Sequence, residues 1–172
     1  KFETKGDILL RVKNKLELFQ VPDLLVFTLK ETKIFGLSKI IDTISNYFSC
    51  NRLVIRSSAL CEDSLKDSKA GKYTSILDID KSNKNEIMSA IKKVFSSYDC
   101  INEHDQIIVQ ECISNVSLSG VIFTRDINTG APYFVINYDD VTGLTDSVTA
   151  GKNIYSNRIL YIRHDARNEI KS

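Results

Sequence analysis

Several residue types that mark specialised proteins are scarce in this sequence. The 172 residues include no tryptophan and two histidines, and the formal net charge is +1. A balance so near neutrality argues against a protein that binds nucleic acid mainly through charge. No apolar run approaches the ~18 residues of a membrane-spanning helix, and no signal-peptide pattern opens the chain. We therefore expect neither nucleic acid nor a membrane among the partners.

The few cysteines and histidines form no recognisable metal pattern. Cys50, Cys61, Cys100 and Cys112 are irregularly spaced, with no C-x-x-C pair. The two histidines, at positions 104 and 164, lie among polar residues, so we do not expect a zinc site. Scattered free thiols are typical of proteins in the reducing cytoplasm, and we expect a cytoplasmic location.

The hydrophobic pattern predicts an α+β fold. Apolar residues recur at helical spacing over residues 5–19, with Thr4 as a suitable N-cap, and again over 37–48 and 83–98. Short apolar runs bounded by turn residues predict strands over 24–28, 52–57, 74–79, 106–112, 118–124, 133–138 and 158–163. Because strands and helices mix early and strands dominate late, we expect a mixed, largely antiparallel sheet flanked by helices.

One stretch has the chemistry of a phosphate site. Residues 54–63 read VIRSSALCED, and residues 68–75 read SKAGKYTS. The predicted strand thus ends near Arg56, and a loop with Gly71 between Lys69 and Lys72 follows. An arginine together with backbone N–H groups and two ammonium groups suits a polyphosphate. The alternatives are an ion pair of Arg56 with Glu62 or Asp63, and a surface turn with solvated lysines.

Further motifs follow in a consistent order. They are Val109-Gln110, then 119–126 reading SGVIFTRD with Thr129-Gly130, then Gly143-Leu144-Thr145-Asp146 with Gly151. Together with 54–75, these segments resemble the nucleotide-binding, ATP-grasp-like domain of the phosphoenolpyruvate synthase and pyruvate phosphate dikinase family. Five elements in the family's order, over most of the chain, make the resemblance specific.

The resemblance implies a set of phosphate-binding residues. Lys5, in the sequence TKGDIL, is similar to a family lysine that reaches the nucleotide phosphates, although the glycine before it is missing and the alternative is a solvated lysine. Arg56 is the candidate catalytic and phosphate-binding residue, because a guanidinium holds two oxygens at once. Ser75 takes the family's hydroxyl position, or is an ordinary strand serine. The lid over the phosphates is formed by Ser68, Lys69, Ala70, Gly71 and Lys72.

Two further positions follow from the resemblance. Gln110 and Glu111 lie where a hinge strand presents backbone groups to the adenine edge. Asp126 matches the family aspartate, with a turn-forming role ahead of Thr129-Gly130 as the alternative. The cofactors implied are ATP and Mg²⁺.

The departures from the family pattern are also informative. Asp146 stands where the family has a glutamate, and the late acidic element that binds magnesium is absent, so the Mg²⁺ ligands are expected outside this chain. The family's phosphohistidine motif is absent, and neither His104 nor His164 lies in such a context. Because Lys1 is not an initiator methionine, we expect residues 1–172 to be the N-terminal ATP-binding domain, an incomplete fragment of a larger multidomain enzyme.

Residues 137–149 resemble one branch of the family, the L-glutamine kinases of capsule phosphoramidate biosynthesis. Such an enzyme converts ATP, glutamine and water to AMP, phosphate and glutamine phosphate, through a phosphohistidine domain that serves the small-molecule acceptor. The alternatives are a phosphoenolpyruvate synthase acting on pyruvate and a non-catalytic nucleotide- or partner-binding module. A P-loop kinase is excluded, because Gly71-Lys72 is followed by Tyr73 rather than Ser or Thr and has no glycine five residues earlier.

Overall fold

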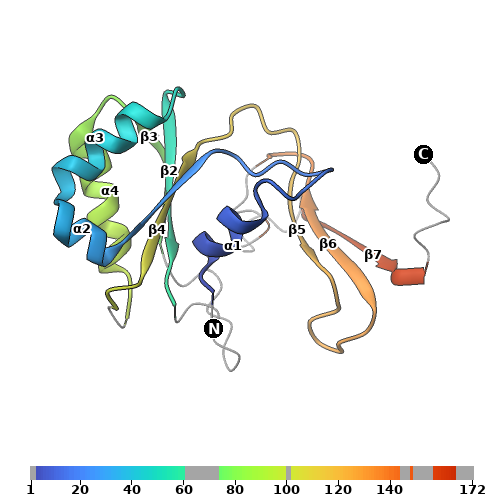
Figure 1. The fold of residues 1–172 in the computed structure, drawn as a ribbon. Helices are drawn as coiled ribbons and strands as arrows, with labels where there is room; N and C mark the ends of the chain where they lie inside the picture. The colour runs from blue at the N-terminus through green and yellow to red at the C-terminus, as the bar shows by residue number, and fades with distance from the viewer. Residues whose placement is uncertain (1–2, 61–73, 100–101, 144–147, 149–156, 166–172) are drawn as a thin grey trace. The chain divides into compact units, whose positions relative to one another are not determined.

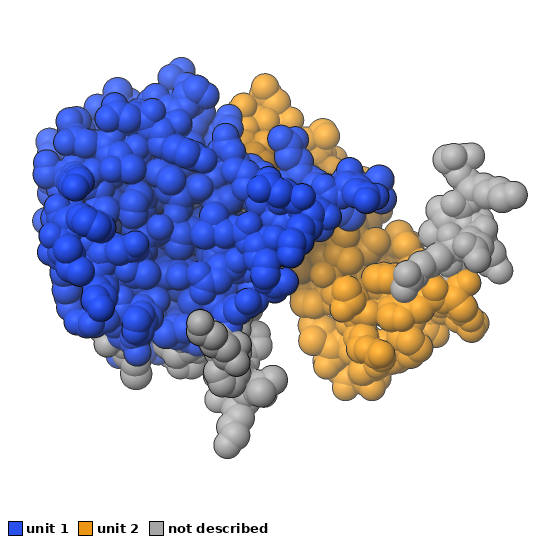
Figure 2. Space-filling view, in the orientation of Figure 1, with its two compact units in different colours: residues 1–112 blue, residues 113–172 orange. Residues whose placement is uncertain are grey.

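The structure is a computed structural model that describes residues 3–60, 74–99, 102–143, 148 and 157–165. The chain forms two compact units, Lys1–Cys112 and Ile113–Ser172, coloured blue and orange in Figure 2. None of the helices formed by described residues combines the length and apolarity that crossing a bilayer requires.

Unit 1 is a four-stranded antiparallel sheet with helices on both faces (Figure 1). The strand order is β1-β4-β2-β3, and every pairing is antiparallel. The elements are α1 Lys5–Val12, β1 Leu24–Thr28, α2 Leu29–Phe35, α3 Leu37–Tyr47, β2 Arg52–Ser58, β3 Ser75–Asp80, α4 Lys84–Ser96 and β4 Gln106–Glu111.

The two faces of this sheet differ in chemistry. On one face, the central strands β2 and β4 pack under α3 and α4, and the fully buried side chains there include Ile44, Leu53, Ile55, Ile91, Ile107 and Val109. The alternating side chains point the other way. This second surface, the Arg56 face, carries Val54, Arg56 and Ser58 of β2 and Gln106, Ile108 and Gln110 of β4.

The first helix lies on the Arg56 face and is shorter than the sequence predicts. Thr4 and Asp7 form a capping box at its start, which confirms Thr4 as the N-cap. The helix ends at Val12, so the prediction of a helix over 5–19 is wrong beyond that residue. Leu16 and Phe19 are 41% and 68% exposed. The predicted apolar stripe therefore covers no core, and tertiary packing outweighs the periodicity.

The second helix, α2, was absent from the sequence prediction. Thr28 caps it by accepting a hydrogen bond from the Glu31 N–H, and the Glu31 carboxylate accepts from the Thr28 N–H. The T-x-x-E pattern of a capping box is present in the sequence and could have revealed it. The other predicted helices and strands match the structure to within a few residues at each end.

Unit 2 contains a three-stranded antiparallel sheet in the order β5-β6-β7. Its strands are β5 Ser119–Phe123, β6 Tyr133–Asp139 and β7 Asn157–Arg163. The predicted α+β class, with antiparallel sheets flanked by helices, is confirmed.

Candidate nucleotide-binding site

Arg56 lies on β2, with strand partners on both sides. It is directly opposite Ile108 of β4 and Ser75 of β3, so the Ser75 side chain shares its face. Arg56 is exposed, and its side chain makes no hydrogen bond or ion pair with another described residue. Its expected alternative partners, Glu62 and Asp63, lie outside the described residues. Within the described structure the guanidinium is available to an anion from solvent.

Lys5 is brought to the same face of the sheet. The next residue, Gly6, is buried, and its N–H donates to the Ser58 hydroxyl oxygen at 2.9 Å. Ser58 follows Arg56 by two residues on β2, so both side chains point to the Arg56 face. The start of α1, which carries Lys5, therefore packs on the same face of the sheet as Arg56, about fifty positions away in sequence.

The backbone N–H and C=O of Glu111 have no partner on a neighbouring strand of the described sheet. The Cys112 N–H donates to the Arg52 carbonyl at 2.9 Å, so the ladder alternation turns the Glu111 N–H and C=O away from β2. On that other side β1 begins with Leu24, opposite Gln110, and offers Glu111 no strand partner. Gln110 itself is paired on both sides. Of the two hinge residues predicted, Glu111 has the backbone geometry that could meet an adenine edge.

The chain around Arg56 is held by β4 and by residues that the sequence analysis did not single out. The Ser58 N–H donates to the Tyr98 hydroxyl at 3.1 Å, and that hydroxyl donates to the Gln106 carbonyl at 2.6 Å. The Leu60 N–H donates to Asp105 Oδ1 at 2.9 Å. Asp105 is 1% exposed, and its second oxygen accepts from the Asn102 N–H. The sequence signal for these hydrogen bonds is an acid and an amide, Asp105 and Gln106, at the start of the apolar strand β4.

Asp126 belongs to unit 2, where its carboxylate organises a turn. Its Oδ1 accepts from the Asn128 N–H at 3.0 Å, and from the Thr129 N–H and hydroxyl at 2.7 and 2.8 Å. The hydrogen bond from the Thr129 backbone, followed by that from the Thr129 hydroxyl, lowers the pKa of Asp126. These bonds match the turn-forming alternative, and a nucleotide role for Asp126 stays a prediction.

The predicted lid, Ser68, Lys69, Ala70, Gly71 and Lys72, lies outside the described residues. Its place relative to Arg56 therefore stays a prediction.

The chain was compared with known protein families. The sequence model of the pyruvate phosphate dikinase AMP/ATP-binding domain matches residues 28–166, well over half of the chain. The chain belongs to this family. No curated protein matches it. Arg56, Ser75, Gln110, Glu111 and Asp126 fall inside the matched range of this AMP/ATP-binding domain, whereas Lys5 precedes it.

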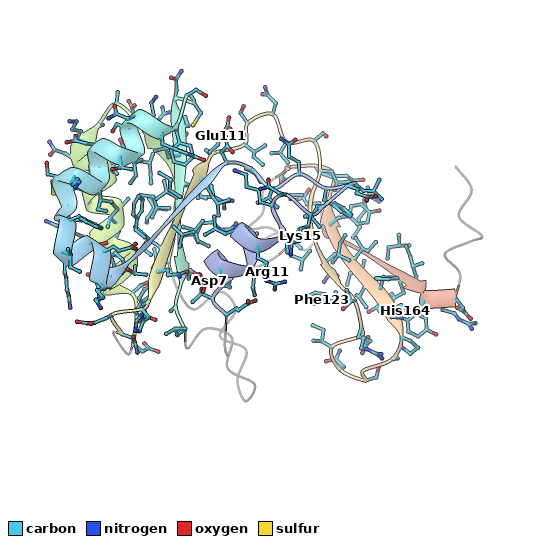
Figure 3. The ribbon with its side chains drawn as sticks, viewed as in Figure 1. Asp7, Arg11, Lys15, Glu111, Phe123 and His164 are labelled. Carbon is cyan, nitrogen blue, oxygen red and sulfur yellow. The ribbon has the colours of Figure 1, made fainter. Side chains whose placement is uncertain are left out.

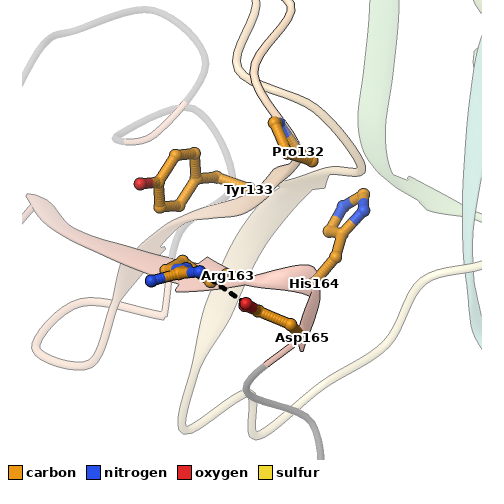
Figure 4. A pocket seen from close by; sticks show the side chains of 5 residues that line it. All are labelled: Pro132, Tyr133, Arg163, His164 and Asp165. Carbon is orange, nitrogen blue, oxygen red and sulfur yellow. Dashed lines mark hydrogen bonds and ion pairs between the residues drawn. The ribbon is translucent and has the colours of Figure 1, made fainter.

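A depression in unit 2 of the domain contains none of the predicted site residues (Figure 4). It is lined by Pro132, Tyr133, Arg163, His164 and Asp165. Arg163 forms an ion pair with Asp165, and His164 Nε2 lies 2.8 Å from the Thr124 carbonyl oxygen. These charged and titratable groups already bond to the protein, so the depression adds nothing to the nucleotide site.

The described part of the domain has no group of three or more His, Cys, Asp or Glu side chains placed to hold a metal ion. Because Mg²⁺ is usually held by one or two carboxylates together with substrate phosphates, this observation does not test the prediction that the Mg²⁺ ligands lie outside this chain.

Proposed function

We propose that the Arg56 face of unit 1 binds ATP as the ATP-binding lobe of a phosphohistidine-type phosphotransferase. The observation that carries the proposal is the exposed Arg56 guanidinium, which has no described protein partner and lies on the same sheet face as the Lys5-bearing helix. In phosphoryl transfer the protein mainly positions and neutralises phosphate oxygens, which is the chemistry that these two cations offer.

The direction of β4 supports one orientation of the nucleotide. Gln106 lies at the end of β4 beside α1. Glu111 lies at the other end of this strand (Figure 3). The five-residue step between them is about 17 Å at the usual strand rise, comparable with the length of an extended ATP molecule. We assign the adenine to the Glu111 end, the phosphates to Arg56 and Lys5, and a supporting hydroxyl to Ser75.

For the phosphoryl acceptor we propose L-glutamine, with AMP and phosphate as the other products. The support is the similarity of residues 137–149 to the glutamine kinase branch. Among the described residues, we identify no side chain that would recognise glutamine. The reaction would use a phosphohistidine domain and Mg²⁺ ligands elsewhere in the full-length protein.

The experiment is an assay of the full-length protein with ATP and either glutamine or pyruvate, followed by phosphorus NMR. A phosphorylated glutamine supports the proposal. Phosphoenolpyruvate would identify a phosphoenolpyruvate synthase instead, and ATP binding without turnover would identify a non-catalytic module.

The same assay tests Arg56. Arg56→Ala is expected to lower kcat/KM for ATP about 10- to 100-fold, the loss of a charge-assisted hydrogen bond of about 1.5–3 kcal/mol. The matched control is Arg52→Ala, an exposed arginine on the same strand that instead pairs with Asp78. Equal rates for Arg56→Ala and Arg52→Ala would remove Arg56 from the site.

A further inference from the structure

The Gln106 side chain joins α1 to the sheet through a buried polar network. Its Oε1 accepts from the Thr4 hydroxyl at 2.5 Å and from the Ser58 hydroxyl at 3.4 Å. Its Nε2 donates to Asp7 Oδ1 at 3.0 Å. Gln106 is 7% exposed and Thr4 is 2% exposed, so water does not replace these bonds at low cost.

The approach of α1 to Gln106 is close enough to require a glycine. A Cβ at Gly6 would lie 2.6 Å from Gln106 Oε1 and 2.9 Å from Val26 Cγ1, inside van der Waals contact. The Gly6 N–H meanwhile donates to Ser58. The start of α1 is therefore located by contacts with both central strands rather than by the helix's own apolar side chains.

The network needs a hydrogen-bond acceptor at one end of side chain 106 and a donor at the other, as an amide provides. The oxygen end faces two hydroxyl groups, whereas the nitrogen end faces the Asp7 carboxylate. A carboxylate in place of the amide would set two anionic groups against each other at the Asp7 end. The charge of Asp7 and the donor group of Gln106 are thus a matched pair.

We propose that Gln106 is a positioning residue for nucleotide binding, which sets the place of α1 and thereby of Lys5 relative to Arg56. The inference rests on the proposed function, since it assumes that Lys5 and Arg56 act on the same phosphates. Two cations bind one polyphosphate well only at the right separation, and a misplacement of about 1 Å can cost about 100-fold in rate. Gln106 itself touches no phosphate in this arrangement.

The test measures ATP affinity and thermal stability of the full-length protein for a set of variants. Gln106→Glu is expected to weaken ATP binding about 10- to 100-fold, because repulsion from Asp7 displaces α1. The double variant Gln106→Glu with Asp7→Asn exchanges donor and acceptor, and is expected to recover most of the affinity. Gln20→Glu, which adds the same charge at an exposed position, is expected to bind ATP like the wild type.

A double-mutant cycle with Lys5 separates positioning from general loss of structure. If Gln106 acts through Lys5, Gln106→Glu changes the affinity of a Lys5→Ala protein less than about twofold. An equal loss with and without Lys5 would overturn the inference, since Gln106 would then act through stability alone.

A second variant covers the case in which Gln106→Glu does not fold. Gly6→Ala displaces α1 without changing any charge, and its loss of affinity should likewise disappear in the Lys5→Ala protein. If the wild type binds ATP and both Gln106→Glu and Gly6→Ala bind it equally well, only the positioning role fails. If the wild type does not bind ATP, the proposed function fails, and the positioning role fails with it.

Discussion

The two units bury their apolar side chains to different extents. In unit 1 the core between the sheet and its helices includes Ile44, Ile55 and Ile91, each fully buried. Among the described residues of unit 2, Val135 is the one buried hydrophobic side chain, whereas Ile122 and Leu160 are 56% and 47% exposed. The described strands of unit 2 form a single three-stranded sheet, which offers little surface against which to bury them.

Two aspartates near candidate site residues also differ in burial, although unit 2 has a fully buried acid of its own, Asp139. Asp105 of unit 1 is 1% exposed and fixes the chain that follows Arg56, whereas Asp126 of unit 2 bonds to its own exposed turn. If two cationic side chains must lie at a set separation, a buried acid that fixes the neighbouring backbone supports the site better than an exposed turn does. The acid that is buried and fixes the chain next to Arg56 therefore lies in unit 1.

The largest expected effect tests the difference in cores. Ile91→Ala is expected to destabilise the protein by about 2–5 kcal/mol, because it leaves a cavity at a fully buried position. Ile122→Ala, at an exposed position of unit 2, is expected to change stability by less than about 0.5 kcal/mol. Urea denaturation of both variants measures this, and similar losses would mean that Ile122 is covered in solution.

The next effect concerns the buried acid. Asp105→Ala leaves the N–H groups of Leu60 and Asn102 without an acceptor, and is expected to cost about 2–4 kcal/mol. Asp126→Ala is the control, with a smaller expected loss because water can reach its turn. If the two aspartates proved interchangeable in urea denaturation, the distinction between a buried and an exposed aspartate would be wrong.

A pH measurement sharpens the comparison in unit 2. Hydrogen bonds from Thr129 lower the pKa of Asp126 in the folded state. Its contribution to stability is therefore complete above the pKa of the unfolded chain and is lost as pH falls through the lower, folded pKa. Thr129→Val removes the hydroxyl bond but keeps the backbone bond, so the Asp126 pKa should rise part of the way. Carboxyl carbon shifts by NMR follow this titration, and an unchanged pKa would contradict the assignment.

The smallest effect is at the Glu111 end of the site. Burial, and then the charge of Glu111, raise the pKa of the Cys50 thiol. Glu111→Gln is expected to lower this pKa and to increase the alkylation rate of Cys50 at mildly alkaline pH by a few-fold. Mass spectrometry of the Cys50 peptide measures the rate. A rate that does not respond to Glu111→Gln would show that the two groups do not interact.

Much of the fold could be predicted from local sequence. Strand β1 was predicted with its observed bounds, and β2 and β4 to within one residue, because short apolar runs between turn residues have few alternatives. The end of α1 could not be predicted, since residues 13–19 keep a helical apolar pattern that the tertiary structure does not use. The support by Asp105 and Gln106 was missed because its hydrogen bonds link segments that are distant in sequence.

The sequence by itself determined the positions of most elements and the capping of α1 by Thr4, and it predicts a phosphate site around Arg56. These features depend on neighbouring residues, whose interactions are the same in any fold. Only the tertiary structure decided that α1, which carries Lys5, packs on the Arg56 face and that Asp126 serves a turn in the other unit. The contacts of Gly6, Ser58 and Gln106 join residues up to 102 positions apart, and such contacts exist only when the sheet and α1 have packed together.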